Sequence, residues 1–342
     1  MSHVGLSHII EIMSSTISGP IRSSKSGVVD YRRLGASRVP CIPLIIPEHG
    51  PAIDGGCLLR DLPDALASGA IYLAYQPKLN LRTGGIESVE ALIRWDHPRF
   101  GNIPPSLLIS SAESAGEMNG LTLWVIQRAI DEQRLLARGG RQLTVYVNIS
   151  AILLTDHGFM REICERASEA AGQIGLEVTE TSVIAEPKMG IANLKRLVDL
   201  GFVISIDDYG TGLSSLVYLQ DLPASELKID KQFISDMTKN HRGPLIVRST
   251  IDLAHALGMK VVAEGIESPA TLALLRVMGC DYGQGFHISS PLTLATLVDF
   301  LDHHDDRTLL EGTASTLQPP EAFWAHAERE RPVESRRLAR AR

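Results

Sequence analysis

The chain has 342 residues, of which 44% are hydrophobic and 21% are charged, so it is long enough to bury a sizeable core in one large domain or two medium ones. Its formal net charge of −7 argues against a protein that coats a nucleic-acid polymer with a basic surface. The four cysteines form no CxxC pair, and we find neither a secretion signal nor a run of roughly 18 apolar residues. We therefore expect a cytoplasmic protein without a membrane span, a disulfide framework or a zinc knuckle.

The two ends of the chain differ in composition from its middle. Residues 1–55 are rich in Ser, Gly and Pro, which predicts an irregular leader. Residues 56–304 show a regular rhythm of apolar runs and helical patterns, which predicts a folded domain. Residues 305–342 are polar and become Arg-rich, which predicts a solvated tail.

Strand-like runs and helical patterns alternate through the middle of the chain. The expected strands are Ile71–Asn80, Ile86–Trp95, Thr144–Ser150, Ile174–Glu180, Phe202–Asp207, Glu226–Asp230, Lys260–Glu264 and Asp281–Phe286. The expected helices are Leu59–Ala67, Thr122–Ala137, His157–Ala171, Pro187–Leu200, Pro244–Leu257, Pro269–Met278 and Leu294–Leu301. This alternation favours an α/β fold with crossover helices. Eight strands fit a TIM-type (β/α)8-like barrel, which typically takes about 250 residues.

The connection between the first two strands departs from the standard barrel. Residues 81–85 alone join them, which is too short for a parallel crossover. The sequence Thr83-Gly84-Gly85 is typical of a hairpin turn. We therefore expect these two strands to be antiparallel.

Polar side chains recur at or near the ends of the expected strands. In a βα barrel these ends meet at one mouth, where catalytic groups lie. In chain order the residues are Gln76, Glu90, Arg94, Asn148, Glu177, Glu180, Asp207, Asp208, Lys228, Asp230, Glu264 and Gln284. A single acid at a strand end is more often a helix cap or a surface residue than a ligand. Repetition over eight successive strands favours a functional cluster.

Asp207 and Asp208 follow directly on the buried run 202–206. Two adjacent carboxylates there would repel each other and lose hydration unless a cation compensates them, and the candidates are divalent metal ions and the Lys228 ammonium. Oxygen ligands without Cys or His suit Mg²⁺ or Mn²⁺. One carboxylate could bridge two ions, an arrangement used in phosphoester hydrolysis. The residues alone thus favour a metal-dependent phosphodiesterase.

Several short motifs stand in one order along the chain. They are Tyr75-Gln76-Pro77, Glu90-Ala91-Leu92-Ile93-Arg94-Trp95, His97-Pro98, Val147-Asn148-Ile149-Ser150, Glu177-Val178-Thr179-Glu180-Thr181, the run IDDYGTG at 206–212, Leu227-Lys228-Ile229-Asp230, Val262-Ala263-Glu264-Gly265 and Gly283-Gln284-Gly285. The set resembles the motifs YQP, EALxRW, VNLS, ExTES and IDDFGTG of the EAL-domain cyclic-di-GMP phosphodiesterases. The resemblance covers residues 57–303 and implies a barrel with one antiparallel strand.

The resemblance implies a site with two Mg²⁺ or Mn²⁺ ions. Glu90, Asn148, Glu177 and Asp207 would ligate the first ion. Asp207 would also bridge to the second ion, which Asp208 would hold as well. We expect this set to be complete, because no ligand position of the family motifs is replaced.

The resemblance also implies catalytic and substrate-binding roles. Lys228 would orient and acidify the attacking water, Glu264 would act near the second ion or as a base, and Gln284 would position water or substrate. Gln76 and Arg94 would hold cyclic-di-GMP.

The loop after the two aspartates has two interpretations. Gly210-Thr211-Gly212 predicts either a simple turn or a flexible loop that moves when metal or substrate binds. The resemblance favours the mobile loop and implies that Glu180 anchors it. Tyr209 replaces the usual Phe, and Leu213 stands where the family usually has Tyr or Phe, so the packing of this loop departs from the family pattern.

The function that we expect is hydrolysis of cyclic-di-GMP to linear pGpG. The alternative is a cyclic-di-GMP receptor with little hydrolysis that acts through a protein partner. Two observations favour this alternative. Leu213 departs from the family pattern, and residues 1–55 contain no recognisable sensory or cyclase domain. The resemblance also implies a homodimer formed through the barrel.

Overall fold

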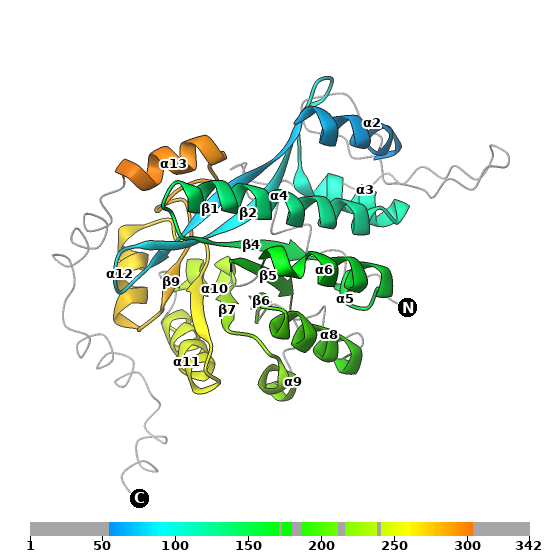
Figure 1. Ribbon diagram of the computed structural model, residues 1–342. Coiled ribbons are helices and arrows are strands. Elements are labelled where there is room, and N and C mark those ends of the chain that lie inside the picture. Colours follow the sequence, from blue (N-terminus) through cyan, green and yellow to red (C-terminus); the bar gives the residue numbers. More distant parts are fainter. Residues whose placement is uncertain (1–54, 171–172, 180–186, 211–215, 238–240, 304–342) are drawn as a thin grey trace, which may run out of the picture. The chain divides into compact units, whose positions relative to one another are not determined.

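A computed structural model describes residues 55–170, 173–179, 187–210, 216–237 and 241–303 (Figure 1). Residues 1–54 and 304–342, which hold the expected leader and tail, lie outside the described residues. The chain divides into two compact units. The first contains the chain up to Leu73 together with Ile93–Val125, and the second contains Ala74–Leu92 and the chain from Ile126 onward.

Among the described residues, the first unit holds two complete helices, a short hairpin and the beginning of a third helix. Helix α2 (Gly55–Ser68) includes the expected helix, and α3 (Pro105–Ala115) begins with a proline in its first turn. Strand β3 (Gly101–Ile103) pairs antiparallel with the end of β2 (Ile86–His97). The sequence analysis missed β3 and α3. A three-residue strand has no readable alternation, and the prolines Pro104 and Pro105 at the start of α3 mask its helical pattern.

The second unit contains a closed sheet. Around the barrel the strand order is β1-β9-β8-β7-β6-β5-β4-β2, and a β1–β2 pairing closes it. The strands are β1 (Ile71–Asn80), β2, β4 (Thr144–Ile149), β5 (Ile174–Thr179), β6 (Val203–Tyr209), β7 (Glu226–Ile229), β8 (Lys260–Ala263) and β9 (Tyr282–Gly283). Neighbours from β2 through β4 to β9 are parallel, whereas β1 is antiparallel to β9. The expected barrel with an antiparallel first strand is confirmed.

The turn between β1 and β2 explains that orientation. The Asn80 N–H donates to the Gly85 carbonyl at 2.9 Å, and the Gly84 N–H donates to the Asn80 carbonyl at 2.9 Å. The Asn80 side-chain oxygen accepts from the N–H groups of Arg82 and Thr83, both at 3.0 Å. Gly84 has a φ of +82°, which favours glycine. These contacts form the hairpin expected from the sequence.

Helices follow most of the parallel strands and surround the sheet (Figure 1). They are α4 (Met118–Arg138, in this unit from Ile126), α5 (Ala151–Leu154), α6 (His157–Ala170), α8 (Pro187–Asp199), α9 (Leu216–Asp221), α10 (Lys231–Asp236), α11 (Gly243–Ala256), α12 (Pro269–Val277) and α13 (Leu294–His303). The longer ones agree with the expected helices, whereas α5 and α10 are too short for a periodic pattern and were missed. Within the described ranges, none of the helices combines the length and apolar character needed to cross a membrane.

The last barrel strand is shorter than expected. The sequence predicts a strand over Asp281–Phe286, but β9 covers only Tyr282 and Gly283. Gly285 passes so close to the backbone of Ile266 that a Cβ atom there would lie 2.2 Å from the Ile266 nitrogen. Just after the end of β9, the Ile266 N–H donates to the Gln284 carbonyl at 3.0 Å.

Alternation along the strands separates an apolar outside from a polar inside. Leu176, Ile204 and Leu227 are completely or almost completely buried and belong to the apolar core. The neighbouring positions Glu177 and Lys228 are also buried, and they contact each other although they lie on β5 and β7, which are not adjacent in the sheet. Such contacts can form only inside the barrel. The interior is therefore polar near the ends of the parallel strands.

Candidate active site

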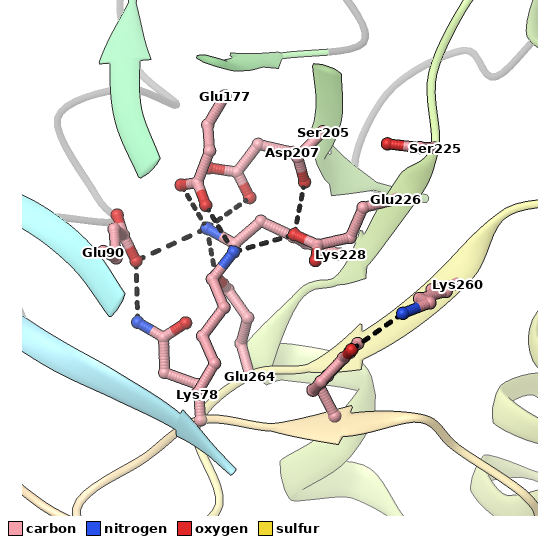
Figure 2. Close-up of polar contacts among 12 residues, drawn as sticks. Lys78, Glu90, Glu177, Ser205, Asp207, Ser225, Glu226, Lys228, Lys260 and Glu264 are labelled. Carbon is pink, nitrogen blue, oxygen red and sulfur yellow. Dashed lines mark hydrogen bonds and ion pairs between the residues drawn. The ribbon is translucent and has the colours of Figure 1, made fainter. Parts of the chain in front are cut away.

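The ammonium group of Lys228 lies at the centre of a carboxylate cluster (Figure 2). Its Nζ atom lies 2.6 Å from Glu264 Oε1 and 2.7 Å from Glu177 Oε2. The same atom lies 3.3 Å from Asp207 Oδ1 and 3.5 Å from Glu90 Oε2. The Lys228 side chain is only 1% exposed. Five positions expected from different strands thus meet at one point.

Amide side chains border this cluster. Asn148 Nδ2 donates to Glu90 Oε1 at 2.8 Å, and Gln284 Nε2 donates to Glu90 Oε2 at 2.7 Å. Gln284 Nε2 also lies 3.0 Å from Gln76 Oε1, and Gln76 Nε2 donates to the carbonyl of Ser289 at 3.1 Å. Asn148 is exposed and Gln76 is half-buried, so the cluster opens to solvent on this side. The amides also fix the orientation of Glu90.

Asp207 and Asp208 lie at an irregularity of β6. The β6–β7 register shifts between Ile206 and Tyr209, and Asp208 has a φ of +57°, in the left-handed region. Adjacent residues of a regular strand point to opposite faces, and the irregularity interrupts that alternation. Both carboxylates are buried, and Asp207 Oδ1 accepts the N–H of Asp208 at 2.9 Å. Backbone strain at a non-glycine residue is common at functional sites.

Burial and mutual repulsion raise the pKa of most carboxylates in the cluster. The pKa of Asp208 rises to about 8, first because of burial and then because of the negative charge of Asp207. Burial is also the largest cause that raises the pKa of Glu90, Asp207 and Glu264, and Lys228 opposes it only in part. Burial and the neighbouring carboxylates therefore disfavour the ionised form of these acids, and Lys228 offsets that effect only in part. A cluster of this kind attracts further cations or protons.

Glu177 is the exception within the cluster. Burial alone would raise its pKa, but the ammonium groups of Lys228 and Lys78 outweigh burial and lower the pKa to about 2. The pKa of Lys228 rises well above its ordinary value, since Asp207 and Glu177 overcome the opposing effect of burial. Glu177 and Lys228 are therefore both charged at neutral pH.

The structure brings four further residues to the site that the sequence analysis missed. They are Lys78, Tyr146, Ser205 and Glu226, and all are buried. Lys78 Nζ donates to Glu177 Oε1 at 2.8 Å and to Glu226 Oε1 at 2.7 Å (Figure 2). Each of the four lies two positions along its strand from a predicted residue. That period of two is the signal that could have revealed them.

The remaining predicted residues are Asp230, Arg94 and Glu180. Asp230 caps helix α10, because its side chain accepts the N–H of Gln232 at 2.8 Å. Arg94 belongs to the first unit, where its Nη1 donates to the carbonyl of Ile93 at 2.9 Å. Glu180 and residues 211–215 of the expected mobile loop lie outside the described residues. The anchoring role of Glu180 stays a prediction.

The cluster supplies the oxygen donors that hard cations prefer. The acids converge on the Lys228 ammonium, and in the part of the chain that the structure describes no three His, Cys, Asp or Glu side chains are arranged to hold a metal ion. The site is therefore an acidic cluster whose central cation is a lysine. The oxygen donors of this cluster suit a divalent ion, although their present arrangement is not a coordination shell.

A comparison with known families identifies the domain. A family model for the EAL domain matches residues 59–291. The chain belongs to the EAL domain family. The match includes every residue of the carboxylate cluster and its amide border, and it lies within the range expected for the folded domain.

Similar proteins agree with this assignment of an EAL domain. The chain is 41% identical over 246 residues to "Cyclic di-GMP phosphodiesterase NbdA" of Pseudomonas aeruginosa, which covers 71% of this chain and 31% of that protein. It is 38% identical over 245 residues to "Bifunctional diguanylate cyclase/cyclic di-GMP phosphodiesterase MucR" of the same organism, covering 70% and 36%. The EAL domain thus spans about a third of the length of these curated relatives.

A solved EAL structure is similar to this fold. It is described as the PaMucR phosphodiesterase in a c-di-GMP complex, and it has a TM-score of 0.66 and 38% sequence identity. The match covers 70% of this chain and 99% of that chain. That structure is described with the dinucleotide c-di-GMP bound.

Proposed function

We propose that this EAL domain is a metal-dependent phosphodiesterase that hydrolyses cyclic-di-GMP to linear pGpG. The observation that carries the proposal is the convergence of Glu90, Glu177, Asp207 and Glu264 on Lys228 inside a barrel of this family. Relatives at 38% and 41% identity are named as cyclic di-GMP phosphodiesterases, and the similar solved structure is described as a c-di-GMP complex.

The donor set fits a pair of Mg²⁺ or Mn²⁺ ions. Glu90, Asn148, Glu177 and Asp207 would hold the first ion, and Asp207 and Asp208 would hold the second. The pKa of Asp208, raised to about 8 first by burial and then by the negative charge of Asp207, supports this assignment because a bound cation would offset both effects. When bound, such ions polarise a phosphoryl oxygen and lower the pKa of water.

The chain's own residues would then position and deprotonate the nucleophile. Lys228 would donate a hydrogen bond to the attacking water and orient it. Glu264, which contacts Lys228 at 2.6 Å, would accept the proton that the water loses. The water oxygen would bond to phosphorus, the bond from phosphorus to the ribose 3′ oxygen would break, and the proton accepted by Glu264 would return through solvent to that oxygen. The product keeps a 5′ phosphate, as linear pGpG requires.

Amide groups at the open side would position the dinucleotide. Gln284 and Gln76 contact each other through a 3.0 Å hydrogen bond, and Gln76 is half-buried. Gln284 would place water or substrate, while Gln76 and Arg94 would hold cyclic-di-GMP. Fixed amide donors suit phosphate and base edges because they bind without a change of charge.

Chromatography of cyclic-di-GMP after incubation with purified protein and Mg²⁺ tests this function. Wild-type protein should produce pGpG, and Glu90→Ala should abolish turnover while the barrel stays folded. Glu165→Ala is the matched control, because Glu165 is exposed on α6 and should leave turnover unchanged. If wild-type protein at a concentration equal to that of cyclic-di-GMP leaves the dinucleotide intact in Mg²⁺, the proposed enzymatic function is wrong.

The same experiment separates the enzyme from a receptor. A receptor would bind cyclic-di-GMP tightly in Ca²⁺ or EDTA and hydrolyse almost none of it in Mg²⁺. A homodimer formed through the barrel and a cytoplasmic location both stay predictions. Sedimentation velocity measured with and without cyclic-di-GMP tests the first of them.

A further inference from the structure

Lys78 lies beneath the carboxylate cluster and is completely buried, with 0% of its surface exposed. It belongs to β1, the antiparallel strand of the barrel. Its Nζ donates to Glu177 Oε1 at 2.8 Å and to Glu226 Oε1 at 2.7 Å (Figure 2). The same atom lies 3.5 Å from the ring centroid of Tyr146. A lysine is almost never buried to this extent unless it is paired.

The residues around Lys78 form a polar layer of hydrogen-bonded side chains. Ser205 Oγ donates to Glu226 Oε1 at 2.9 Å, and the hydroxyl of Tyr146 hydrogen-bonds to Glu226. Gly175 gives space to the Tyr146 ring, because a Cβ atom at Gly175 would lie 2.4 Å from Tyr146 Cδ1. The interior of such a barrel is normally filled by bulky branched apolar side chains. Here the layer below the site is instead built to hold an ammonium group.

Stability alone does not explain this layer. Apolar residues of similar volume usually replace a buried ion pair without loss of stability, and often with a gain. What matters is the contact that this buried layer makes with the carboxylate cluster above it. Lys78 holds Glu177 Oε1 from below, while Lys228 holds Glu177 Oε2 at 2.7 Å. Both oxygens of one carboxylate are therefore fixed by two different cations.

Among the contacts of the described residues, Glu90, Asp207 and Glu264 are each held from the site layer itself. Glu90 is held by Asn148, Gln284 and Lys228, all within the site layer. Glu264 and Asp207 contact Lys228 from that layer as well. Glu177 is thus the carboxylate that joins the buried layer to the site by a direct hydrogen bond.

We propose that Lys78 is a positioning residue, which fixes the orientation of the Glu177 carboxylate so that it can serve as a metal ligand. Glu226, with its bonds from Ser205 and Tyr146, keeps Lys78 in place beneath Glu177. This inference rests on the proposed function, because it assigns Glu177 to a divalent ion. Partners that orient metal ligands in this way typically contribute 10–100-fold to metal affinity or activity.

A charge-balanced double variant tests the proposal. Lys78→Met alone would leave Glu226 buried without a counterion and could prevent folding. Lys78→Met combined with Glu226→Gln removes one positive and one negative charge together and keeps the length of both side chains. Glu226→Gln alone is the control, because it preserves the Lys78–Glu177 contact.

Isothermal titration of Mn²⁺ into metal-free protein, without cyclic-di-GMP, gives the readout. We expect the double variant to fold with an unfolding temperature near that of the wild type and to bind Mn²⁺ about 10–100-fold more weakly. Glu226→Gln should bind Mn²⁺ with nearly wild-type affinity. At saturating Mn²⁺ the double variant should recover most of its turnover, since the loss lies in metal affinity.

The outcomes separate this inference from the proposed function. An unchanged Mn²⁺ affinity in the folded double variant overturns the positioning role, and so does an equal loss in Glu226→Gln. A double variant that cannot fold would show that Lys78 serves stability, which also overturns the proposal. If wild-type protein binds no Mn²⁺, the metal-dependent function itself fails and this inference fails with it.

Discussion

Replacement of Lys228 by methionine is the most direct test of the electrostatics of this site. Methionine preserves most of the volume of the buried stem but removes the ammonium group that contacts Glu90, Glu177, Asp207 and Glu264. The variant therefore leaves an acidic cluster whose only other described cation contact is between Lys78 and Glu177.

The cost of Lys228→Met in metal-free protein should be large. Removal of one partner from a buried ion pair typically costs about 3–5 kcal/mol, and Lys228 is 1% exposed, so solvent screens it little. The lost ammonium raises the pKa of Glu90, Asp207 and Glu264 further, so these acids take up protons in the folded state. Because unfolded acids release those protons, the cost should be smaller near pH 5 than near pH 8.

Urea unfolding in EDTA at pH 5 and pH 8 measures this cost. Lys195→Met is the matched control, because Lys195 is exposed on α8 and its replacement should change stability by no more than about 0.5 kcal/mol. Mg²⁺ at about 100 times its dissociation constant should add about 2.7 kcal/mol to any form that binds one ion. We expect Lys228→Met to keep this gain but to lose turnover, since the water is no longer oriented.

Two results would refute this reasoning. A loss below about 1 kcal/mol in EDTA at pH 8 would mean that Lys228 is not the counterion of the cluster. Full turnover of Lys228→Met in Mg²⁺ would show that the ammonium group takes no part in the reaction.

Three further predictions concern single positions. In metal-free protein, Asp208 has a pKa raised from 3.8 to about 8, so the folded state keeps a proton that the unfolded chain releases. The free energy of unfolding should therefore fall as pH rises across this interval, and Asp208→Asn should make that fall smaller. Parallel pH curves for wild type and variant would contradict this reasoning. Gly175→Ala should lower stability by about 1–3 kcal/mol in thermal unfolding, because the new methyl group meets a buried tyrosine ring. Gly120→Ala, in open space on α4, should not lower it. Ser268→Ala removes the 3.1 Å cap bond at the start of α12 and should cost about 1 kcal/mol, so an unchanged unfolding midpoint would contradict the cap.

Local patterns allowed much of the fold to be predicted. The alternation of apolar runs and helical patterns indicated the barrel, and the Thr83-Gly84-Gly85 turn indicated the antiparallel first strand. These features depend on neighbouring residues, so a sequence reveals them directly. Short elements carry no period, and β3, α5 and α10 were missed for that reason.

The site could be predicted only in part. Acids and amides at strand ends stood out because they interrupt apolar runs, whereas Lys78 and Glu226 read as ordinary strand residues. Their importance depends on contacts between residues far apart in the chain, such as Lys78 with Glu177 and Glu226. Asp230 shows the converse, because it follows a strand like the others but caps a helix.

The sequence by itself determined which residues carry the charge and which family they belong to. The tertiary structure decided which cation faces which carboxylate, because only the register of the closed sheet brings residues from β2, β5, β6 and β7 to one point. It also decided that a second lysine lies beneath the first. Strand alternation restricts a side chain to one of two faces, but closure of the barrel turns one of those faces into a buried interior where a few ångströms separate residues 78, 177 and 228.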